Sequence, residues 1–443
     1  MQNDLNKSFS ILTLGCAKNE VDSDVMRTRL VTAGLSEVED VVDADIVIIN
    51  TCAFLQVATQ QSIELILDVA QSQQDASIEA PIVVCGCMPS RYKDDLKELL
   101  PEVENFVGCA DEDSIVSVVY NALGIDETPV LLEQSKARTI ESSSAYVMIS
   151  DGCNRFCSFC AIPYIRGRYH SRCETQILEE VKMLMEGGVK EIVLIGQDTG
   201  IWGCDMDDPT KNLAWLLRQV AEVVAPYDGW VRVLYLQPEG MTDDLISTIR
   251  DTKEILNYID IPIQHCNSEV LTRMRRKGSV EEYTELFARL RKEIPGMTLR
   301  STALVAFPGE TEEQFDELYE FVKETEFDYC SCFAYSQEDG TLAAKLDGQL
   351  DEDTKLEREQ TMRDLCEMSG FAATAAHVGE VCDVIIDGVE ETDHGLELIG
   401  HTWFQAPDSD GAVHIASGDV VVGDKVKCKL VDSFCYELVG EII

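Results

Sequence analysis

Three cysteines, Cys153, Cys157 and Cys160, lie in one short run with the spacing CxxxCxxC, directly after a strand-like segment, Ala145–Ser150. Three thiolates in one loop can bind three irons of a [4Fe–4S] cluster, whereas a closed structural cluster uses four cysteines. One iron is then left open to a ligand that is not protein. The alternatives are redox-active thiols or zinc, but structural zinc usually takes a fourth Cys or His at a compatible spacing.

The residue between the last two cysteines is aromatic, Phe159, and the run resembles the signature of the radical SAM superfamily. The resemblance implies that the open iron binds the amino and carboxylate groups of S-adenosylmethionine (SAM). It also implies that the reduced cluster cleaves SAM to a 5′-deoxyadenosyl radical. Phe159 is then expected to present its backbone to the adenine, with packing against the fold as the structural alternative.

The composition points to a reducing compartment. The chain has 443 residues, enough for several domains, and seventeen cysteines. Its first ten residues are polar and show no signal peptide, so the cysteines indicate metal and redox use in the cytoplasm rather than a disulfide framework. No segment approaches the ~20 apolar residues that a membrane span requires.

The formal net charge is −45. Binding to a phosphate backbone calls for Lys and Arg, so direct binding of nucleic acid is not expected. An acidic surface attracts basic partners. The alternative is that the charge only keeps the protein soluble, or reflects an acidic proteome.

Residues 5–125 alternate strand-like and helix-like segments, which is typical of βαβ units and a parallel sheet. The predicted strands are Phe9–Leu14, Ala44–Asn50, Pro81–Cys85 and Phe106–Gly108, and the predicted helices are Glu20–Ala33, Gln56–Gln71, Ser90–Leu100 and Glu112–Leu123.

Cys16, Cys52 and Cys87 each follow one of these strands. The carboxyl ends of parallel strands meet at one sheet edge, so the three thiols are expected to converge there and to bind a second [4Fe–4S] cluster with an open iron. The alternative is that each is a small buried hydrophobic residue, which suits Cys85, inside its strand. Cys109 also follows a strand, and the pattern leaves the roles of Cys85 and Cys109 open.

Residues 138–370 continue the alternation through six predicted strands, which suits a partial (βα)6 barrel. Active groups should lie at the carboxyl ends of the strands, and the candidates for binding SAM there are Gln197, Asp198, Gln264 and Glu310. His265 could instead orient a loop. A long charged helix, Asp351–Ala376, is predicted to close the barrel.

Residues 371–443 change to short β-like runs, which predict a small five-stranded barrel. This segment carries three Lys and no Arg against fourteen Asp and Glu. Such a barrel should repel phosphate and attract a basic protein.

Together, the three spaced amino-terminal cysteines and the CxxxCxxC run resemble the methylthiotransferases. Further matching stretches run through nearly the whole chain: Leu14–Asn19, Asn50–Phe54, Pro101–Glu104, Ile162–Tyr169, Leu236–Gly240, Ile261–His265, Phe307–Thr311 and Tyr335–Thr341. The resemblance implies an amino-terminal methylthiotransferase domain, a radical SAM core and a carboxy-terminal TRAM-like barrel.

Within that family the chain is most similar to the branch that adds a methylthio group to the β-carbon of an aspartate in protein twelve of the small ribosomal subunit. The resemblance implies two [4Fe–4S] clusters, two molecules of SAM per turnover and an electron donor such as a flavodoxin-like protein. The acidic last segment favours this branch over the transfer-RNA adenosine methylthiotransferases, which remain the nearest alternative. A non-catalytic iron–sulfur carrier or redox sensor is the alternative from another class.

Arg166, Arg168 and Arg172 form a basic patch in an acidic chain. They could pair with a carboxylate of SAM or of the substrate. The structural alternative, that they bridge domains through the protein's own carboxylates, is slightly favoured.

Overall fold

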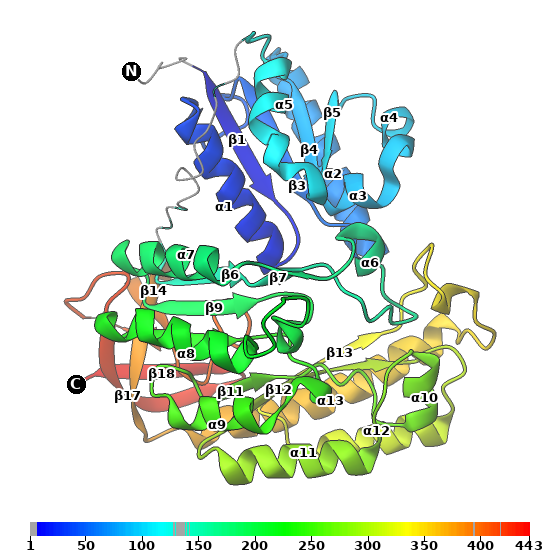
Figure 1. Ribbon diagram of the computed structural model, residues 1–443, viewed down its shortest axis with the longest axis vertical. Helices are drawn as coiled ribbons and strands as arrows, with labels where there is room; N and C mark the ends of the chain where they lie inside the picture. The colour runs from blue at the N-terminus through cyan, green and yellow to red at the C-terminus, as the bar shows by residue number, and fades with distance from the viewer. Residues whose placement is uncertain are drawn as a thin grey trace. The chain divides into compact units, whose positions relative to one another are not determined.

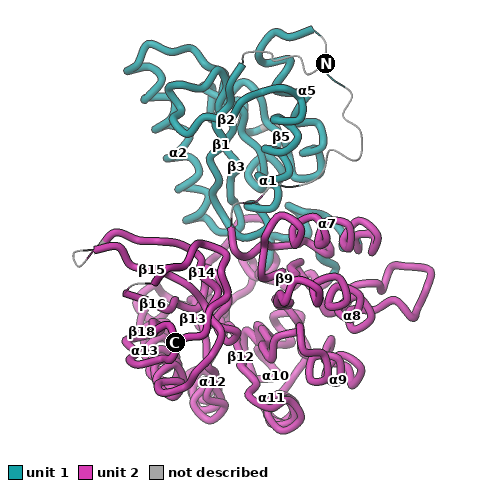
Figure 2. Tube along the Cα trace, turned by 90° about the vertical axis from the view of Figure 1, so that its left-hand side faces the viewer, with its two compact units in different colours: residues 1–139, 151–154, 160–170 teal, residues 140–150, 155–159, 171–443 magenta. Residues whose placement is uncertain are grey.

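The computed structural model describes residues 7–126, 129, 138, 140, 142–392, 395–416 and 418–443. The chain divides into two compact units, which Figure 2 colours separately. The amino-terminal unit consists of residues 1–139, 151–154 and 160–170, and the carboxy-terminal unit consists of residues 140–150, 155–159 and 171–443. In the part of the chain that is described, no helix has the length and apolarity to cross a membrane.

The amino-terminal unit is built on a five-stranded parallel sheet with the order β2-β1-β3-β4-β5. Its strands are β1 (Ser8–Thr13), β2 (Ser36–Glu37), β3 (Ile46–Thr51), β4 (Ile82–Gly86) and β5 (Asn105–Gly108). Its helices are α1 (Ala17–Thr32), α2 (Gln56–Ala76), α3 (Cys87–Tyr92), α4 (Leu96–Leu99), α5 (Ile115–Ala122) and α6 (Ile162–Ile165).

Both faces of this sheet are covered, as is usual for parallel sheets. The central strand β3 is buried at every position. Val47 and Ile49 contribute to an apolar cluster that includes Ile66 of α2, whereas Ile46 and Ile48 contribute to a second cluster on the other face. The alternating apolar segments therefore predicted the parallel sheet correctly.

The prediction of one helix over Ser90–Leu100 is wrong. Helix α3 begins at Cys87 and ends at Tyr92, and α4 covers only Leu96–Leu99. Between them Lys93 has φ 49°, a left-handed backbone conformation that interrupts the helix. The short strand β2 was not predicted.

The carboxy-terminal unit contains six parallel strands of a partial barrel, arranged as two three-stranded ladders, β6-β9-β10 and β11-β12-β13 (Figure 1). The strands are β6 (Ser144–Met148), β9 (Glu191–Ile195), β10 (Trp230–Val233), β11 (Tyr258–Asp260), β12 (Thr298–Val305) and β13 (Tyr329–Ala334). The ladders are joined by a bridge between Val231 and Ile255 and by a hydrogen bond from Leu236 N–H to Asp260 O of 3.0 Å.

Helices lie on the outside of these strands (Figure 1) and share one apolar core with them. They are α7 (Glu174–Glu186), α8 (Leu213–Val224), α9 (Asp243–Asp251), α10 (Ser268–Arg273), α11 (Val280–Glu293), α12 (Glu312–Thr325) and α13 (Glu352–Ala376). Two short strands, β7 (Ser150–Asp151) and β8 (His170–Ser171), form a separate two-stranded ladder.

The structure divides the segment Ser268–Ile294 into α10 and α11. Arg275 and Gly278 between them have φ 58° and 141°. A Cβ at Gly278 would overlap the Tyr283 ring, so a glycine is required where the chain turns into α11. Ser279 then caps α11 by accepting a hydrogen bond from Glu282 N–H.

The last segment forms the expected closed five-stranded barrel, with the order β14-β15-β16-β18-β17. Its strands are β14 (Val381–Thr392), β15 (Gly395–Thr402), β16 (Val413–Ile415), β17 (Lys425–Phe434) and β18 (Glu437–Ile442).

A buried polar network joins this small barrel to the partial barrel within the carboxy-terminal unit. His401 of β15 contacts Glu191 at the start of β9, with 2.9 Å between Nε2 and Oε2. Arg232 of β10 donates to the same carboxylate at 2.6 Å. Asp410 accepts from Tyr258 at 2.5 Å and pairs with Arg300 at 3.2 Å. The small barrel is therefore attached at the amino-terminal ends of the strands of the partial barrel.

Candidate functional site

Cys16, Cys52 and Cys87 lie at the carboxyl edge of the amino-terminal sheet. Cys16 is the N-cap of α1, Cys52 follows β3 and Cys87 is the first residue of α3. The strand register aligns these ends, because Thr13 pairs with Asn50 and Thr51 pairs with Gly86. The arrangement matches what the sequence predicted for strands that end together.

Two glycines allow this edge to be crowded. A Cβ at Gly15, with φ 123°, would lie 3.2 Å from Cys52 Cβ. A Cβ at Gly86, with φ 92°, would overlap Asn50 Oδ1 and come within 2.8 Å of Thr51 O. Glycine is thus required immediately before Cys16 and before Cys87, where the backbone approaches its neighbours closely.

Two buried asparagines fix the start of α1 against the end of β3. Asn19 Nδ2 donates to Asn50 Oδ1 at 3.1 Å, and Asn50 Nδ2 donates to Asn19 O at 2.9 Å. The Cys16 thiol donates to Asn19 Oδ1 over 3.5 Å. Because both amides are fully buried and paired, the position of Cys16 relative to Cys52 is set by the fold.

Cys87 is the most acidic of the three thiols whose pKa is shifted at this edge. The hydrogen bond from Cys109, opposed by burial and assisted by Arg166, lowers the pKa of Cys87 to about 6. The pKa of Cys109 is raised because its thiol is the donor to Cys87. This lowered pKa favours the thiolate of Cys87, the form that binds metal.

The pKa of Cys52 is raised, first by burial and then by the nearby Cys87 and Cys16 thiols. Thiolates at Cys16 and Cys87 would thus repel a thiolate at Cys52. A bound cation would replace the thiol protons and relieve that repulsion.

Arg166, which directly follows α6 and has a side chain only 2% exposed, is the cation of this edge. It donates to Asp22 at 2.6 Å and lies 3.6 Å from Asp151, besides its contact with Cys87. Although burial opposes it, the charge of these two carboxylates raises the pKa of Arg166. The partners of Arg166 are the protein's own carboxylates, and both lie in the same unit as Arg166, so the predicted bridging of domains stays a prediction.

Burial raises the pKa of the neighbouring Glu112 to about 9, and Asp22 adds to the shift. Asp22 and Glu112 were missed at the sequence level. Nothing in the spacing of charges on a helix distinguishes a buried carboxylate from a solvated one.

No group of three His, Cys, Asp or Glu side chains within the described ranges is spaced to hold one metal ion. Each thiolate of a cubane binds a different iron, so its three cysteines lie farther apart than the ligands of a single ion. The second [4Fe–4S] cluster predicted for Cys16, Cys52 and Cys87 remains a prediction.

The second cysteine set occupies the loop that follows β6 and β7. Cys153 is buried, whereas Cys157 and Cys160 are partly exposed. Cys153 N–H donates to Gly167 O at 3.2 Å, and a Cβ at Gly152 would overlap Arg168 O. Cys153 is thereby held against the segment that follows α6.

Ser158 and Phe159 anchor the middle of this loop to the carboxy-terminal unit. Ser158 N–H donates to Met274 O at 3.0 Å, and Ser158 Oγ donates to Arg273 O at 2.8 Å. The Phe159 side chain packs on a cluster that includes Met274 and Phe307. The structure thus shows how the Phe159 side chain packs. The contact predicted between the Phe159 backbone and adenine remains a prediction.

Asp198, at the carboxyl end of β9, is fully buried and is held by Arg155 of the cysteine loop. The Arg155 Nε–Asp198 Oδ2 distance is 2.5 Å, and Arg155 also pairs with Glu239 at 3.2 Å. Burial raises the pKa of Asp198 against the opposing effect of Arg155. Gln197 precedes Asp198 at the same strand end. Arg155 and Glu239 were not predicted as site residues.

Gln264 follows β11 in a left-handed conformation, φ 68°, that is unusual for a residue with a side chain. Its N–H donates to Thr302 O at 2.8 Å, and its carbonyl accepts from Leu304 N–H at 2.6 Å. Backbone strain of this kind is often found at functional sites.

Glu310 is satisfied by the protein itself. Its carboxylate accepts from Ala306 N–H at 3.0 Å and from Arg358 at 2.6 Å, and it lies 3.5 Å from His265 Nε2. Burial opposes ionisation, but the hydrogen bonds of these groups outweigh it and lower the pKa of Glu310. His265 lies beside the Glu310 carboxylate, and both its predicted role and the SAM contacts predicted for Gln197, Asp198, Gln264 and Glu310 remain predictions.

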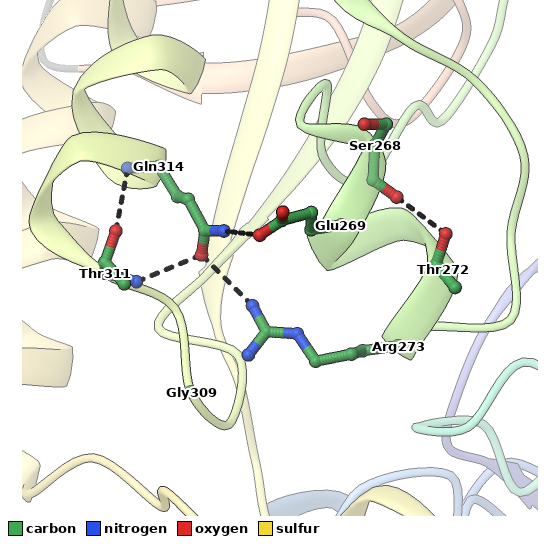
Figure 3. Close-up of a pocket in the computed structure, with 7 residues that line it drawn as sticks. All are labelled: Ser268, Glu269, Thr272, Arg273, Gly309, Thr311 and Gln314. Atoms are coloured by element: carbon green, nitrogen blue, oxygen red, sulfur yellow. Dashed lines mark hydrogen bonds between the residues drawn. The ribbon is translucent and has the colours of Figure 1, made fainter.

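Arg172, another member of the basic patch, donates to Glu180 at 2.7 Å and to Met148 O at 2.5 Å. A separate pocket of about 440 Å³ lies between α10 and the start of α12 (Figure 3). Its polar groups bind one another: Arg273 donates to Gln314 at 3.1 Å, and Gln314 donates to Glu269 at 3.1 Å.

Three family profiles match successive parts of the chain. The profile of an uncharacterized protein family, UPF0004, matches residues 8–108, that of the radical SAM superfamily matches residues 147–322, and that of the TRAM domain matches residues 378–443. The division at 5–125, 138–370 and 371–443 remains a prediction.

Among solved structures, the chain is similar to the radical S-adenosylmethionine methyltransferase TsrM of Kitasatospora setae, with a TM-score of 0.56 and 14% identity over 74% of this chain and 72% of that one. This likeness supports the fold. The partial barrel with its small carboxy-terminal barrel is therefore confirmed.

The chain is 39% identical over its full length, and over 100% of the relative, to the ribosomal protein uS12 methylthiotransferase RimO of Trichlorobacter lovleyi. It is 40% identical, again over 100% of both chains, to the protein of the same name from Geotalea uraniireducens. Radical SAM enzymes use SAM and a [4Fe–4S] cluster, and the matched residues 147–322 include the cysteine run at Cys153. The chain belongs to the ribosomal protein uS12 methylthiotransferase (RimO) family of radical SAM enzymes.

Proposed function

We propose that this enzyme replaces a hydrogen on the β-carbon of one aspartate of ribosomal protein uS12 with a methylthio group, using two molecules of SAM per turnover. Membership of the RimO family supports the substrate. The observation that carries the chemistry is the presence of two separate sets of three cysteines, Cys16, Cys52 and Cys87 at a sheet edge and Cys153, Cys157 and Cys160 in one loop.

Each cysteine set would hold one [4Fe–4S] cluster and leave one iron without a protein ligand. When bound, the loop cluster and SAM supply a carbon-centred radical, which can remove a hydrogen atom from a carbon too weakly acidic for any general base. The amino-terminal set would hold the sulfur that is methylated and transferred. Three cysteines fit this role better than four, because the open iron is the place for a sulfur that must leave.

The chain's own residues position these groups. Arg155 fixes the loop cluster's segment to Asp198 at the end of β9, and Ser158 fixes it to α10. We propose that Gln197, Asp198 and Gln264 contact SAM, because they lie at the carboxyl ends of β9 and β11. Phe159 would present its backbone to the adenine while its ring stays in the apolar cluster.

The acidic last barrel supports a protein substrate over transfer RNA. Its three Lys against fourteen Asp and Glu give no basic face for phosphate. We therefore expect no direct RNA binding. We also propose that the enzyme acts in the cytoplasm, where its ribosomal substrate is found, with a flavodoxin-like protein as electron donor.

The substrate assignment is tested by offering the anaerobically reconstituted enzyme both purified uS12 and transfer RNA, with methyl-labelled SAM and a chemical reductant. The proposal expects label in uS12 and none in RNA. Label in RNA alone would make the enzyme a transfer-RNA methylthiotransferase. Label in neither, with no cleavage of SAM, would favour a non-catalytic iron–sulfur carrier.

The second cluster is tested by iron and sulfide analysis. The wild-type chain should bind about eight irons, and a Cys52→Ala variant should bind about four. If the Cys52→Ala variant retained the full iron content, the amino-terminal cysteines would not be a cluster site. Cys85→Ala is the matched control, because Cys85 is buried inside β4 and its pKa is raised well above the usual range by burial.

A further inference from the structure

The last strand of the catalytic barrel has an open edge. Strand β13 pairs with β12 from Tyr329 to Ala334, and in the described residues no strand pairs with its other side. Tyr335 N–H donates to Val305 O at 2.9 Å, so the backbone groups of Tyr335 and of every second residue before it face β12. In a parallel ladder alternate residues bond to one neighbour, so the backbone groups of Cys330, Cys332 and Ala334 face away from β12. Cys330 and Cys332 are only 9% and 5% exposed, and both line a groove at this edge.

Nothing in the sequence of this edge blocks it. Exposed edge strands are usually protected by Lys, Pro or a bulge, because an open edge invites another strand to pair. β13 contains neither a charged residue nor a proline, and its pairing with β12 is regular throughout. An unprotected edge of this kind is typical of a strand that has a partner.

A groove of about 270 Å³ runs along this edge. Five consecutive residues of β13, Tyr329–Phe333, line it, and Phe333 is 52% exposed. The opposite walls come from Arg363 and Glu367 of α13, which packs beside β13 (Figure 1), and from the small barrel through Ser409 and Tyr436. The groove therefore offers both backbone hydrogen bonds and side-chain contacts to an extended segment.

A loop of the small barrel marks one end of the groove. Tyr146 of β6 donates to Pro407 O and to Asp408, both at 3.1 Å, while Asp410 binds Tyr258 and Arg300 at the starts of β11 and β12. Because all six strands run in parallel, the groove leads from this loop toward the strand ends that carry Gln197 and Gln264.

The charges of the groove favour a basic occupant. Arg300 pairs with Asp410 at 3.2 Å, and Arg363 pairs with Glu359 at 2.6 Å, so neither cation is left uncompensated. Glu367 has no cationic partner within the part of the chain that the structure describes. The surplus charge along the groove is thus negative, like that of the adjoining small barrel.

We propose that the basic substrate protein binds by adding a β-strand to the open edge of β13, with its backbone on Cys330, Cys332 and Ala334. This mode of binding gives affinity through main-chain hydrogen bonds and selectivity through side chains in the flanking groove. It would carry the reactive segment from the small barrel to the active end of the catalytic barrel. The inference rests on the proposed function, because it takes uS12 as the substrate.

Amide hydrogen exchange on the anaerobic holoenzyme, with and without purified uS12, is the test. Strand addition predicts slower exchange in the segment Tyr329–Ala334, because outward-facing amides become hydrogen-bonded. If uS12 is bound and methylthiolated but exchange in this segment is unchanged, the docking proposal is wrong and the proposed function stands. If the wild-type holoenzyme neither binds nor modifies uS12, both fail.

A charge placed in the groove gives a second readout. Phe333→Lys should raise the Kd for uS12 roughly tenfold or more, since it removes an apolar contact and repels a basic chain. Leu67→Lys is the matched control, because Leu67 is a comparably exposed residue (43%) on α2 of the other unit. Circular dichroism and iron content establish that both variants are folded. Equal Kd values for the two variants would contradict groove binding.

Discussion

Arg166 balances the buried carboxylates beside Cys87 in the amino-terminal unit. Its guanidinium neutralises Asp22 and Asp151 and contacts the Cys87 sulfur. Removing one partner of a buried ion pair leaves the other charge uncompensated, which is strongly destabilising. Arg166→Met is therefore expected to lower the free energy of unfolding by about 3–5 kcal/mol in urea denaturation.

Asp22→Asn is the companion variant, because it removes the charge that Arg166 balances and retains the shape. A loss below roughly 1 kcal/mol in Arg166→Met would contradict the burial of an essential cation here.

Cys109 and Cys87 differ in role although both follow a strand. Cys109 donates a hydrogen bond to the Cys87 thiolate, and its loss should raise the pKa of Cys87 from about 6. In apoprotein, the rate of alkylation at Cys87 against pH reports this pKa. Cys109→Ala is expected to move the midpoint to higher pH. An unchanged midpoint in Cys109→Ala would show that Arg166 alone sets the acidity of Cys87.

At the scale of the elements, the turn from β4 into α3 depends on Gly86. Its φ of 92° and its contact with Asn50 leave no room for a Cβ. Gly86→Ala is expected to cost at least about 1 kcal/mol of stability and to reduce iron binding at Cys87.

Gly124→Ala is the matched control for that substitution. Gly124 has a similar positive φ of 68° in the same unit but open space around a Cβ. Gly124→Ala measures only the backbone cost of a Cβ at positive φ. The steric cost at Gly86 is therefore the difference between the losses of unfolding free energy in the two variants. Equal losses would mean that the contact with Asn50 does not matter.

The sequence was sufficient for the order of these elements, because apolar strands alternate with amphipathic helices in both units. It also located the three amino-terminal cysteines, since each follows a predicted strand and parallel strands end together. It did not reveal the break between α10 and α11, although Gly278 was visible, because helical periodicity resumes on the far side. The contacts of Cys109, Asp22 and Glu112 depend on tertiary packing, which no local pattern encodes.

At the scale of the whole molecule, stability should depend on pH through the network that attaches the small barrel. Burial opposes protonation of His401, but Glu191 and Asp387 outweigh it and raise its pKa to about 9. Because the folded pKa exceeds the unfolded value near 6.5, this stabilisation is complete below pH 6.5 and is lost as the pH rises to about 9.

We expect the melting temperature to fall over this window, with a loss of up to roughly 3 kcal/mol. The pKa of Glu191 is lowered by Arg232 and His401 against burial, so its contribution is present above its usual pKa and disappears at acid pH. His401→Gln should remove the alkaline dependence. A wild-type melting temperature that is constant between these pH values would contradict a protonated His401.

The central claim is that the enzyme transfers a methylthio group to an aspartate of uS12, and mass spectrometry of the protein substrate tests it most directly. Reconstituted enzyme, SAM, reductant and purified uS12 should yield a product heavier by about 46 Da, with tandem spectra placing the added mass on one aspartate. Cys157→Ala, which lacks a proposed ligand of the loop cluster, should give no such product. Cleavage of SAM by the wild-type enzyme with uS12 left at its original mass would contradict the claim.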